Sequence, residues 1–379
     1  MRTGNKNADS RKSPIDENLQ QYYIASQWKL MWRKFKRHKL ALIGGWILIV
    51  FYFVAIFADF LAPYSPQEQD SKHIFAPPQK IRFVDSQGRF SIRPFVYRTQ
   101  FEMNAKTWLR EYREDKSQKY YIRLFHRSEP YPFLSVFTAR VRLIGVDSPA
   151  KLNMLGTDRF GRDLLSRMIN GSRVSLTIGL IGISASFILG CLLGGISGYY
   201  GGTIDMLIQR VIDFLISLPS IPLWMALAAS LPADWPPVKI YFAITIILSI
   251  MGWCDLARVV RGKLLELREA DYVVAARVSA MRTGPIITRH LLPGFLSYLV
   301  VSITLAIPGM ILGETALSFI GIGMREPAIS WGVLLQAGQK FSTIALYPWL
   351  LLPGVLVVIV VLAFNFLGDG LRDAADPYK

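Results

Sequence analysis

The chain has 379 residues, of which 52% are hydrophobic and only 18% charged, and its net charge is +16. Soluble domains carry about a quarter charged residues, so this composition is too apolar for a fully solvated surface and indicates a polytopic membrane protein. Two cysteines argue against a disulfide scaffold and a cysteine-rich metal site. In a chain with long uncharged runs, an excess of positive charge indicates loops on the inner side of a membrane rather than binding of nucleic acid.

The N-terminal segment, residues 1–39, is polar and ends in lysines and arginines that precede the first apolar run. Basic residues beside a span mark the cytoplasmic side, so we place this segment inside the cell. Aromatic and apolar residues recur in it at helical spacing: Trp28, Met31, Trp32 and Phe35. The spacing predicts an amphipathic helix over 26–38 at the membrane surface, with a plain extension of the first span as the alternative.

Six apolar runs are long enough to predict transmembrane helices. They cover residues 40–62, 174–200, 211–231, 238–257, 294–318 and 346–368. The first is of full spanning length and too far from the N-terminus for a cleaved signal peptide. Alternation through six spans places both termini and the basic loop 258–293 in the cytoplasm. The expected fold class is an all-α polytopic membrane protein with a soluble insert between its first two helices.

The insert, residues 63–150, faces outward and is punctuated by prolines. Residues 80–84 and 89–97 flank an Asp-Ser-Gln-Gly turn, which predicts a β-hairpin. Residues 120–125 alternate like another strand, and 104–114 predict a short helix. We therefore expect a small α+β domain. Its positive charge does not contradict the topology, because long loops translocate largely regardless of charge.

Prolines interrupt two predicted spans: Pro219 and Pro222 the third, and Pro308 with Gly309 the fifth. Broken helices at membrane depth are tolerated where they are buried in protein or line a cavity, so these residues are candidates for a transport pathway. The alternative is that these residues only kink the helices so that they pack together, without any role in transport. Glu314 is an acid within the fifth span, and it is either a pathway residue or a structural anchor near the outer end.

Motifs for catalysis or nucleotide binding are absent from the sequence. It contains no G-x-x-x-x-G-K-[ST] loop, no G-x-S-x-G and no H-E-x-x-H. Its 4 histidines are scattered on different sides of the predicted membrane, so we expect no metal site. The sequence therefore gives no indication of an enzyme.

The 258–293 loop is long, charged and contains helix-forming sequence. Ala275 and Ala276 are small and lie close to the larger Tyr272, which suits a short helix pressed into the groove of a partner. Three charged residues could make polar contacts at the rim of that groove: Glu269, Asp271 and Arg277. The loop is therefore the candidate docking site.

The loop, which ends in Leu292-Pro293, resembles the "EAA" loop of importer-type ABC permeases, which docks a coupling helix on an ATPase subunit. Ala275 and Ala276 would be its alanine pair. Two positions depart from that pattern: Val274 replaces the glutamate, and Ala280 replaces the glycine of the turn.

Further stretches extend the resemblance. They are Leu-Gly-Thr-Asp-Arg-Phe-Gly-Arg-Asp at 155–163, Gly-Glu-Thr-Ala-Leu-Ser-Phe-Ile-Gly-Ile-Gly at 313–323 with Ser-Trp-Gly at 330–332, and Asn-Phe-Leu-Gly-Asp-Gly-Leu-Arg-Asp-Ala-Ala-Asp-Pro at 365–377. Together they are similar to the second, or "C", permease subunit of dipeptide/oligopeptide ABC importers. The resemblance covers 28–66 and 150–379, and the segment 67–149 is longer than the usual extracytoplasmic segment.

The resemblance implies a type I importer permease of the bacterial inner membrane that forms half of a pathway for di- or oligopeptides. Its implied partners are a second homologous permease, two cytoplasmic ATPases that hold ATP and Mg, and an extracytoplasmic solute-binding protein; this chain would carry no cofactor. We expect the insert to cap the outer mouth and help seat the binding protein, or to be a solvated lid. The alternatives are import of oligosaccharides or another small solute by the same machinery, an ion-coupled secondary transporter, and a membrane-anchored receptor or scaffold.

Overall fold

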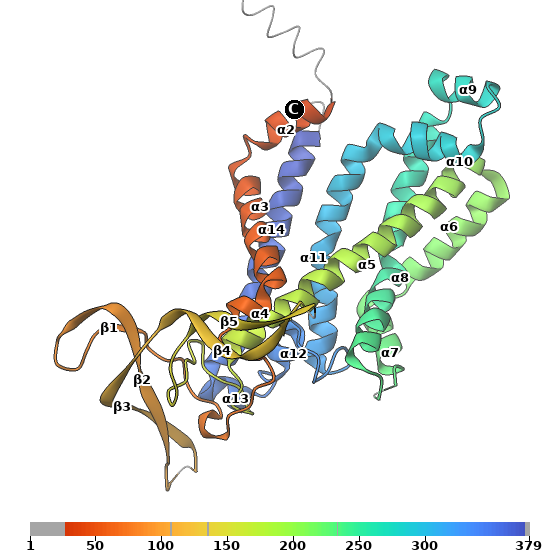
Figure 1. Cartoon of the computed structure of the whole chain (residues 1–379). Coiled ribbons are helices and arrows are strands. Elements are labelled where there is room, and N and C mark those ends of the chain that lie inside the picture. Colours follow the sequence, from red (N-terminus) through yellow and green to blue (C-terminus); the bar gives the residue numbers. More distant parts are fainter. Residues whose placement is uncertain (1–26, 107, 135, 233, 376–379) are drawn as a thin grey trace, which may run out of the picture.

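The computed structural model describes residues 27–106, 108–134, 136–232 and 234–375. Among them, 5 helices are long and apolar enough to cross a membrane (Figure 1). They are α3 (Lys39–Ile56), α5 (Leu164–Tyr200), α8 (Pro237–Leu267), α11 (Leu296–Ile320) and α14 (Leu352–Ala375). The pair α6 (Gly202–Ser217) and α7 (Ser220–Ala229) meets the same criteria as a sixth span bent by 86°. The described residues thus contain five candidate spans, or six if the bent pair is counted as one, and the predicted helical membrane fold is confirmed.

Shorter helices connect these spans. They are α2 (Gln27–Phe35), α4 (Ala58–Leu61), η1 (Ser71–His73), α9 (Asp271–Val278), α10 (Thr283–Pro285), η2 (Ile286–Leu291), η3 (Leu292–Phe295), α12 (Trp331–Gln336), α13 (Phe341–Leu346) and η4 (Pro348–Leu351). Helix α2 is the predicted N-terminal helix, and Met31 is buried in it against Ala374 of α14. Trp32 is 56% exposed. The rest of the predicted cytoplasmic segment, residues 1–26, lies outside the described residues.

Helix α5 is central in the bundle, where it contacts α3, α6, α8 and α11. Its glycines allow a close approach of α8: a side chain at Gly194 would collide with the backbone of Ala257, and one at Gly198 with the backbone of Arg261. Small residues are favoured at such contacts because packing, rather than the hydrophobic effect, holds helices together in lipid. The contact between α5 and α8 therefore depends on these glycines.

Three spans extend beyond their apolar runs. Helix α5 begins at Leu164, well before the predicted start, because Asp163 caps it by accepting a hydrogen bond from the Ser166 backbone N–H at 2.8 Å. Helices α8 and α14 continue to Leu267 and Ala375. These ends carry charged residues, so apolar run length alone does not detect them.

The insert is built from strands in two separate groups. Strands β1 (Arg82–Val84), β2 (Phe90–Met103) and β3 (Arg110–Tyr121) form an antiparallel sheet, and β4 (Arg123–Phe133) pairs with β5 (Phe137–Gly145) as a hairpin. The predicted first hairpin is confirmed. Its turn is held by Asp85, whose carboxylate accepts hydrogen bonds from the backbone N–H groups of Gln87 and Arg89, both at 2.8 Å. The predicted strand at 120–125 is divided between β3 and β4.

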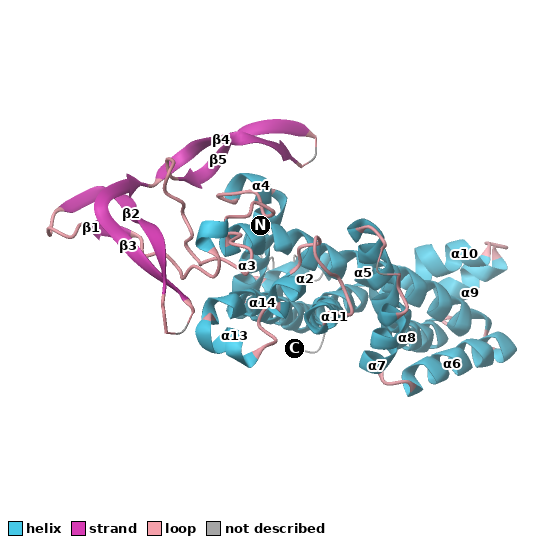
Figure 2. Cartoon of the chain, turned by 90° about the horizontal axis from the view of Figure 1, so that it is seen from below, coloured by secondary structure: helices cyan, strands magenta, loops and turns pink. Residues whose placement is uncertain are grey.

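The short helix expected at 104–114 is wrong. Met103 pairs with Arg110 across β2 and β3, and the chain turns between them. Asn104 favours this turn by accepting a hydrogen bond from the Lys106 backbone N–H at 2.9 Å. Figure 2 shows the β1–β3 sheet beside the α13 and α14 end of the molecule, away from α6, α7 and α8.

Candidate functional site

Helix α9 forms within the 258–293 loop, as its sequence predicts. Val273 is fully buried and Ala276 is 8% exposed, because both belong to an apolar cluster with Val260 and Leu264 of α8. The helix is therefore packed against the end of a membrane-spanning helix. Figure 1 places it at the opposite end of the bundle from the insert.

The other side of α9 is uncovered in this chain and largely apolar. Tyr272 is 47% exposed, Val274 40% and Val278 81%, and Ala275 is exposed beside them. We call these four residues the α9 face. A run of exposed apolar side chains on one side of a helix is typical of a docking surface. Ala276, which the resemblance pairs with Ala275, belongs to the inner side instead.

The turn after α9 forms even though alanine occupies the position of the glycine. Ala280 has φ 56°, in the left-handed region. Its N–H donates to the Arg277 carbonyl at 3.1 Å, and the Met281 N–H donates to the Ala276 carbonyl at 3.2 Å. These are the paired bonds of a Schellman cap. A left-handed alanine costs about 1 kcal/mol, so the departure weakens this turn without changing its shape.

The charged candidates around α9 divide into two groups. Glu269 and Asp271 are exposed and could face a partner. Arg277 is engaged within the chain: its Nη2 donates to the Arg268 carbonyl at 3.3 Å, and its guanidinium lies 5.8 Å from the centre of the Tyr199 ring. Arg277 therefore stabilises the loop, whereas the two acids remain at the rim of the α9 face.

The loop returns to the membrane through η2 and η3. Leu292 is the first residue of η3 and is partly buried against the same apolar cluster that holds α9. Pro293 follows it in η3, and its side chain lies outside the described residues. The terminal Leu-Pro pair therefore lies where the loop becomes α11.

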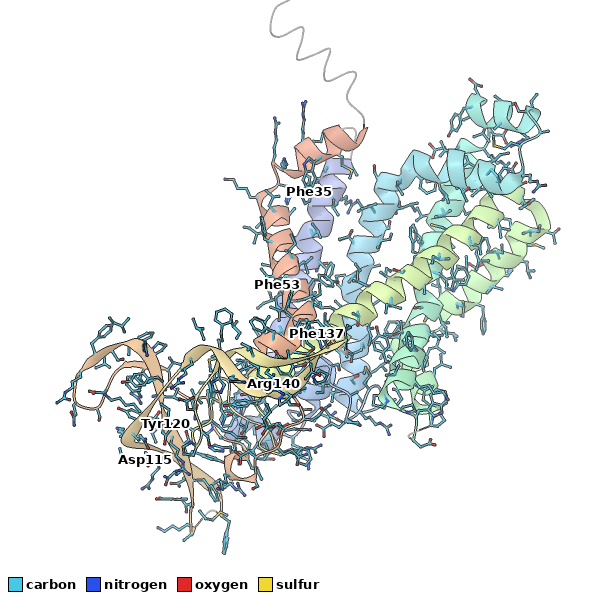
Figure 3. The ribbon with its side chains drawn as sticks, in the orientation of Figure 1. Phe35, Phe53, Asp115, Tyr120, Phe137 and Arg140 are labelled. Atoms are coloured by element: carbon cyan, nitrogen blue, oxygen red, sulfur yellow. The ribbon has the colours of Figure 1, made fainter. Side chains whose placement is uncertain are left out.

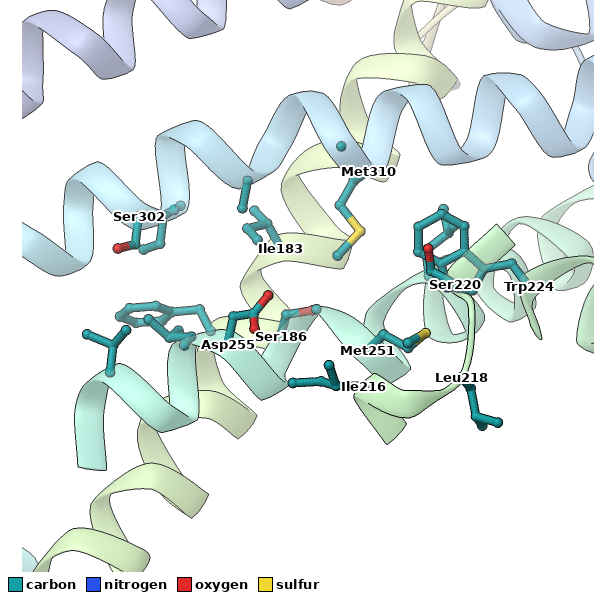
Figure 4. Close-up of a pocket in the computed structure, with 18 of the residues that line it drawn as sticks. Ile183, Ser186, Ile216, Leu218, Ser220, Trp224, Met251, Asp255, Ser302 and Met310 are labelled. Atoms are coloured by element: carbon teal, nitrogen blue, oxygen red, sulfur yellow. The ribbon is translucent and has the colours of Figure 1, made fainter. Parts of the chain in front are cut away.

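A cavity of about 630 Å³ opens between α5, α7, α8 and α11 (Figure 4). Most of its lining is apolar, with serine hydroxyls from several helices. Asp255 of α8 also lines it, and the described residues provide no hydrogen bond or ion pair to this carboxylate. No described residue of the insert lines the cavity. That the insert caps the outer mouth of the pathway stays a prediction.

The proline candidates have different roles. Pro219 lies at the break between α6 and α7 and lines the cavity. Gly309 of α11 also lines the cavity. Pro222 lies in the first turn of α7. Backbone N–H groups in a first turn make no hydrogen bond within the helix, so proline is tolerated there. Helix α11 continues through Pro308, so the predicted interruption of the fifth span is wrong. Neither Pro222 nor Pro308 lines the cavity.

Comparison with known proteins places this architecture in a family. Residues 188–378 match the model described as "Binding-protein-dependent transport system inner membrane component", and residues 26–78 match the "N-terminal TM domain of oligopeptide transport permease C". The chain belongs to this transport-system family. Its members are non-catalytic permease subunits of ABC transporters in the inner membrane, and they carry no cofactor because ATP is bound by partner ATPases.

Individual relatives of the permease have names from peptide transport. The dipeptide transport system permease protein DppC of Alkalihalophilus pseudofirmus is 40% identical over 233 residues, which are 61% of this chain and 74% of that protein. The oligopeptide transport system permease protein OppC of Haemophilus influenzae is 40% identical over 226 residues, 59% and 70% of the two chains. A DppC of Bacillus subtilis is 28% identical over 375 residues, 98% of this chain and 90% of that one.

Glu314 of the permease does not line the cavity. Its carboxylate is fully buried and accepts hydrogen bonds from the hydroxyls of Ser318 at 2.8 Å and Ser330 at 2.6 Å. Trp331, the next residue, donates its indole N–H to the Met168 carbonyl at 3.1 Å. These contacts hold the segment before α12 against α5 and α11. Of the two interpretations of Glu314, they favour the structural anchor.

An ion-pair cluster involves the stretch at 155–163, which the sequence singles out. Arg162 pairs with Asp158 at 2.7 Å and with Glu326 at 2.6 Å, and Arg167 contacts the same two acids. The start of α5 is thereby joined to the segment between α11 and α12. Sequence reasoning missed this because Glu326 is remote in the chain.

Asp255 is the cavity residue that sequence reasoning missed. It lies within the predicted fourth span, 238–257, close to its end. An ionisable residue inside a predicted span is by default a functional candidate, and that rule could have identified it. The uncharged run ends at Cys254, so in the sequence Asp255 has the pattern of a residue at the boundary of a span.

Proposed function

We propose that this permease forms half of the translocation pathway of an importer for di- or oligopeptides. The cavity between α5, α7, α8 and α11 carries the proposal, because a volume of about 630 Å³ lies in the range of small-ligand sites. Its apolar walls suit side chains of varied shape. Its serines and Asp255 suit a peptide backbone and its terminal ammonium group. The names of the relatives support peptides over sugars.

The test is uptake by the assembled importer, in which this permease is combined with its second permease, ATPases and binding protein in vesicles. Labelled dipeptides and oligopeptides should accumulate only with internal ATP. Accumulation of maltooligosaccharides instead of peptides would favour the same machinery with another substrate. Uptake that persists without ATP and stops when ion gradients are dissipated would contradict the importer and favour secondary transport.

The α9 face is the proposed contact with an ATPase subunit. A partner helix groove would bury the exposed Val278 and Tyr272, while Glu269 and Asp271 would face polar groups at the rim. Because α9 packs on α8, which also lines the cavity, a movement of the ATPase would be transmitted to the pathway through one rigid helix. ATP and Mg would remain on the ATPase.

The second homologous permease is proposed to cover the outward side of α6 and α7. This side carries Leu207, Phe214 and Ile221, which are 65%, 64% and 55% exposed. A partner placed there would lie beside the break at Pro219 and close the cavity from its open side. The complete pathway would then run between the two permeases.

Both termini and the 258–293 loop are proposed to lie in the cytoplasm, with the insert outside. Figure 1 supports this because α2 and α9 lie at one end of the bundle and the strands at the other. A membrane-impermeant thiol reagent should label Ser117→Cys, an exposed position of β3, in intact cells, and should label Val278→Cys only after permeabilisation. The reverse pattern would invert the proposed topology.

A further inference from the structure

The β4–β5 hairpin contacts α4, which follows the first span, and it is not hydrogen-bonded into the β1–β3 sheet. The guanidinium of Arg142 donates hydrogen bonds to the carbonyls of Asp59 at 3.1 Å and Ala62 at 2.8 Å. At the hairpin turn, the Leu134 backbone N–H donates to the Asp59 carboxylate at 3.2 Å. That carboxylate also pairs with Arg173 of α5 at 2.9 Å. The hairpin is therefore fixed to the protein at the level where α3 ends.

Aromatic rings continue from the surface of α3 onto the hairpin. The Phe53 and Phe57 rings are 4.6 Å apart, Phe57 lies 6.2 Å from Phe133 of β4, and Phe133 lies 5.1 Å from Phe137 of β5. Phe53 is 53% exposed on α3, a helix apolar enough to span a membrane. The exposed aromatic side of the first span thus continues onto the hairpin, and Figure 3 labels Phe53 and Phe137 at the two ends of this series of rings.

Large apolar side chains at the hairpin are uncovered in the described chain. Phe125 is 65% exposed, Val136 80% and Phe137 58%. Arg127 and Arg140 are also exposed, and the ion pairs found among the described residues do not include them. Apolar side chains mixed with unpaired arginines are typical of elements that lie in a membrane interface, where the rings meet acyl chains and the guanidinium groups meet phosphates.

The placement of the hairpin agrees with such a surface. In Figure 1 it lies at the level of α4, and in Figure 2 it runs along α4 at the edge of the bundle instead of beneath the helices. A hairpin in this position extends over the lipid that surrounds the first span. Successive side chains of a strand alternate between faces, so Phe137 and Arg140 belong to opposite faces of β5. Arg127 lies opposite Val141, two positions beyond Ala139 from Phe137, so Arg127 shares the face of Phe137. That face therefore combines a ring that can reach acyl chains with a guanidinium group that can reach phosphates from the same side.

We propose that the β4–β5 hairpin is an interfacial anchor that lies in the outer leaflet of the phospholipid bilayer. Phe125, Val136 and Phe137 insert between the upper acyl chains, and Arg127 and Arg140 bind headgroup phosphates. The continuity with the lipid-facing surface of α3 selects lipid over a protein partner. The anchor holds the end of the first span at a fixed depth in the membrane. It also holds the connection from β3 to β4, through which the β1–β3 sheet is joined to the hairpin.

Spin labels at three exposed apolar positions test this proposal in proteoliposomes of phosphatidylethanolamine and phosphatidylglycerol. Val136→Cys reports on the hairpin, Val50→Cys on the lipid-facing side of α3, and Met103→Cys on the far end of β2; these residues are 80%, 55% and 51% exposed. Each is placed in a background in which the buried Cys191 and Cys254 are replaced by alanine. The ratio of collision with oxygen to collision with a water-soluble nickel chelate is measured for each label.

The label at 136 should give a ratio several-fold higher than the label at 103 and close to that at 50, because oxygen concentrates in the bilayer and the chelate is excluded. Equal ratios at 136 and 103 would place the hairpin in water and overturn the proposal. A label at 136 that becomes shielded from both reagents when the binding protein and second permease are added would show a protein partner there, which also overturns it. Retention of ATP-dependent uptake verifies that each variant is folded.

Discussion

Arg261 on α8 holds Asp205 on α6 with two parallel hydrogen bonds, Nε to Oδ1 and Nη2 to Oδ2, both at 2.5 Å. The same helix α8 carries the cluster that fixes α9 and the wall that contains Asp255. The pair therefore connects the broken third span to α8, the helix that packs against α9 at one end and lines the cavity further along. Both side chains are partly shielded, at 31% and 15% exposure, so water screens the pair less than it would a surface pair.

Replacing Arg261 by lysine should lower stability by about 1–2 kcal/mol, because a single ammonium cannot reproduce the two parallel bonds. ATP-dependent uptake should fall more than ATP hydrolysis, since α6 would no longer follow α8. Thermal unfolding in detergent and uptake in vesicles measure the two effects. Lys263→Arg is a suitable control, because its partner Glu266 is a neighbour on the same helix. Equal uptake in Arg261→Lys and wild type would mean that the pair only stabilises the fold.

Val278→Asp should reduce association with the ATPase at least tenfold, because an unpaired charge would be buried in the docked α9 face. Co-purification of the ATPase from membranes measures this loss. Met103→Asp, an equally drastic change on the insert, should leave association unchanged. Wild-type association and uptake in Val278→Asp would show that the ATPase contacts another surface.

We expect Ala276→Glu to affect the permease differently from Val278→Asp, because Ala276 is buried within the chain. Its charge would disturb the cluster between α9 and α8 at a cost of several kcal/mol. The loop should therefore become sensitive to protease even in the permease alone. Val278→Asp should not change the digestion pattern. Identical digestion of both variants would contradict the assignment of inner and outer sides of α9.

Ala280→Gly should stabilise the permease by up to about 1 kcal/mol, because glycine adopts the left-handed conformation without the steric cost that alanine bears. Ala280→Val should be destabilising, since a branched side chain is worse still at φ 56°. A thermal-unfolding series of the three residues checks the order Gly, Ala, Val. An order that follows helix propensity, with alanine most stable, would be inconsistent with the turn described.

Local patterns in the sequence identify the membrane helices and α9 because apolar run length and helix-forming residues act over short distances. They do not separate Ala276 from Ala275, since the side of α9 that is buried depends on Val260 and Leu264 of another helix. They also mistake the Asn104 turn for a helix, because the pairing of Met103 with Arg110 only appears once two strands meet. The break at Pro219 is predictable, whereas the continuity of α11 through Pro308 depends on neighbouring helices.

Asp163 should make stability depend on pH. It is 5% exposed at the N-terminus of α5, and burial raises the pKa of its carboxyl from 3.8 to about 7. The folded state thus binds a proton that the unfolded state has lost, so the contribution of this group falls as pH rises from about 4 to about 7, by at most about 4 kcal/mol. Asp163→Asn retains an N-cap acceptor and should flatten that dependence in thermal unfolding. An unchanged pH profile in the variant would assign the dependence to another group.

Asp255→Asn should reduce uptake of peptides with a free amino terminus about tenfold, which corresponds to about 1.4 kcal/mol. The reason is that this carboxylate has no partner in the described chain and is the acid that lines the cavity, so a passing ammonium group would be its counterion. Ser302→Ala, on the facing wall of the same cavity, removes a hydroxyl without changing charge and is the matched control (Figure 4). Uptake of N-acetylated peptides should be equal in Asp255→Asn and wild type. A uniform loss for free and acetylated peptides would mean that Asp255 supports the pathway's shape rather than recognising the terminal charge.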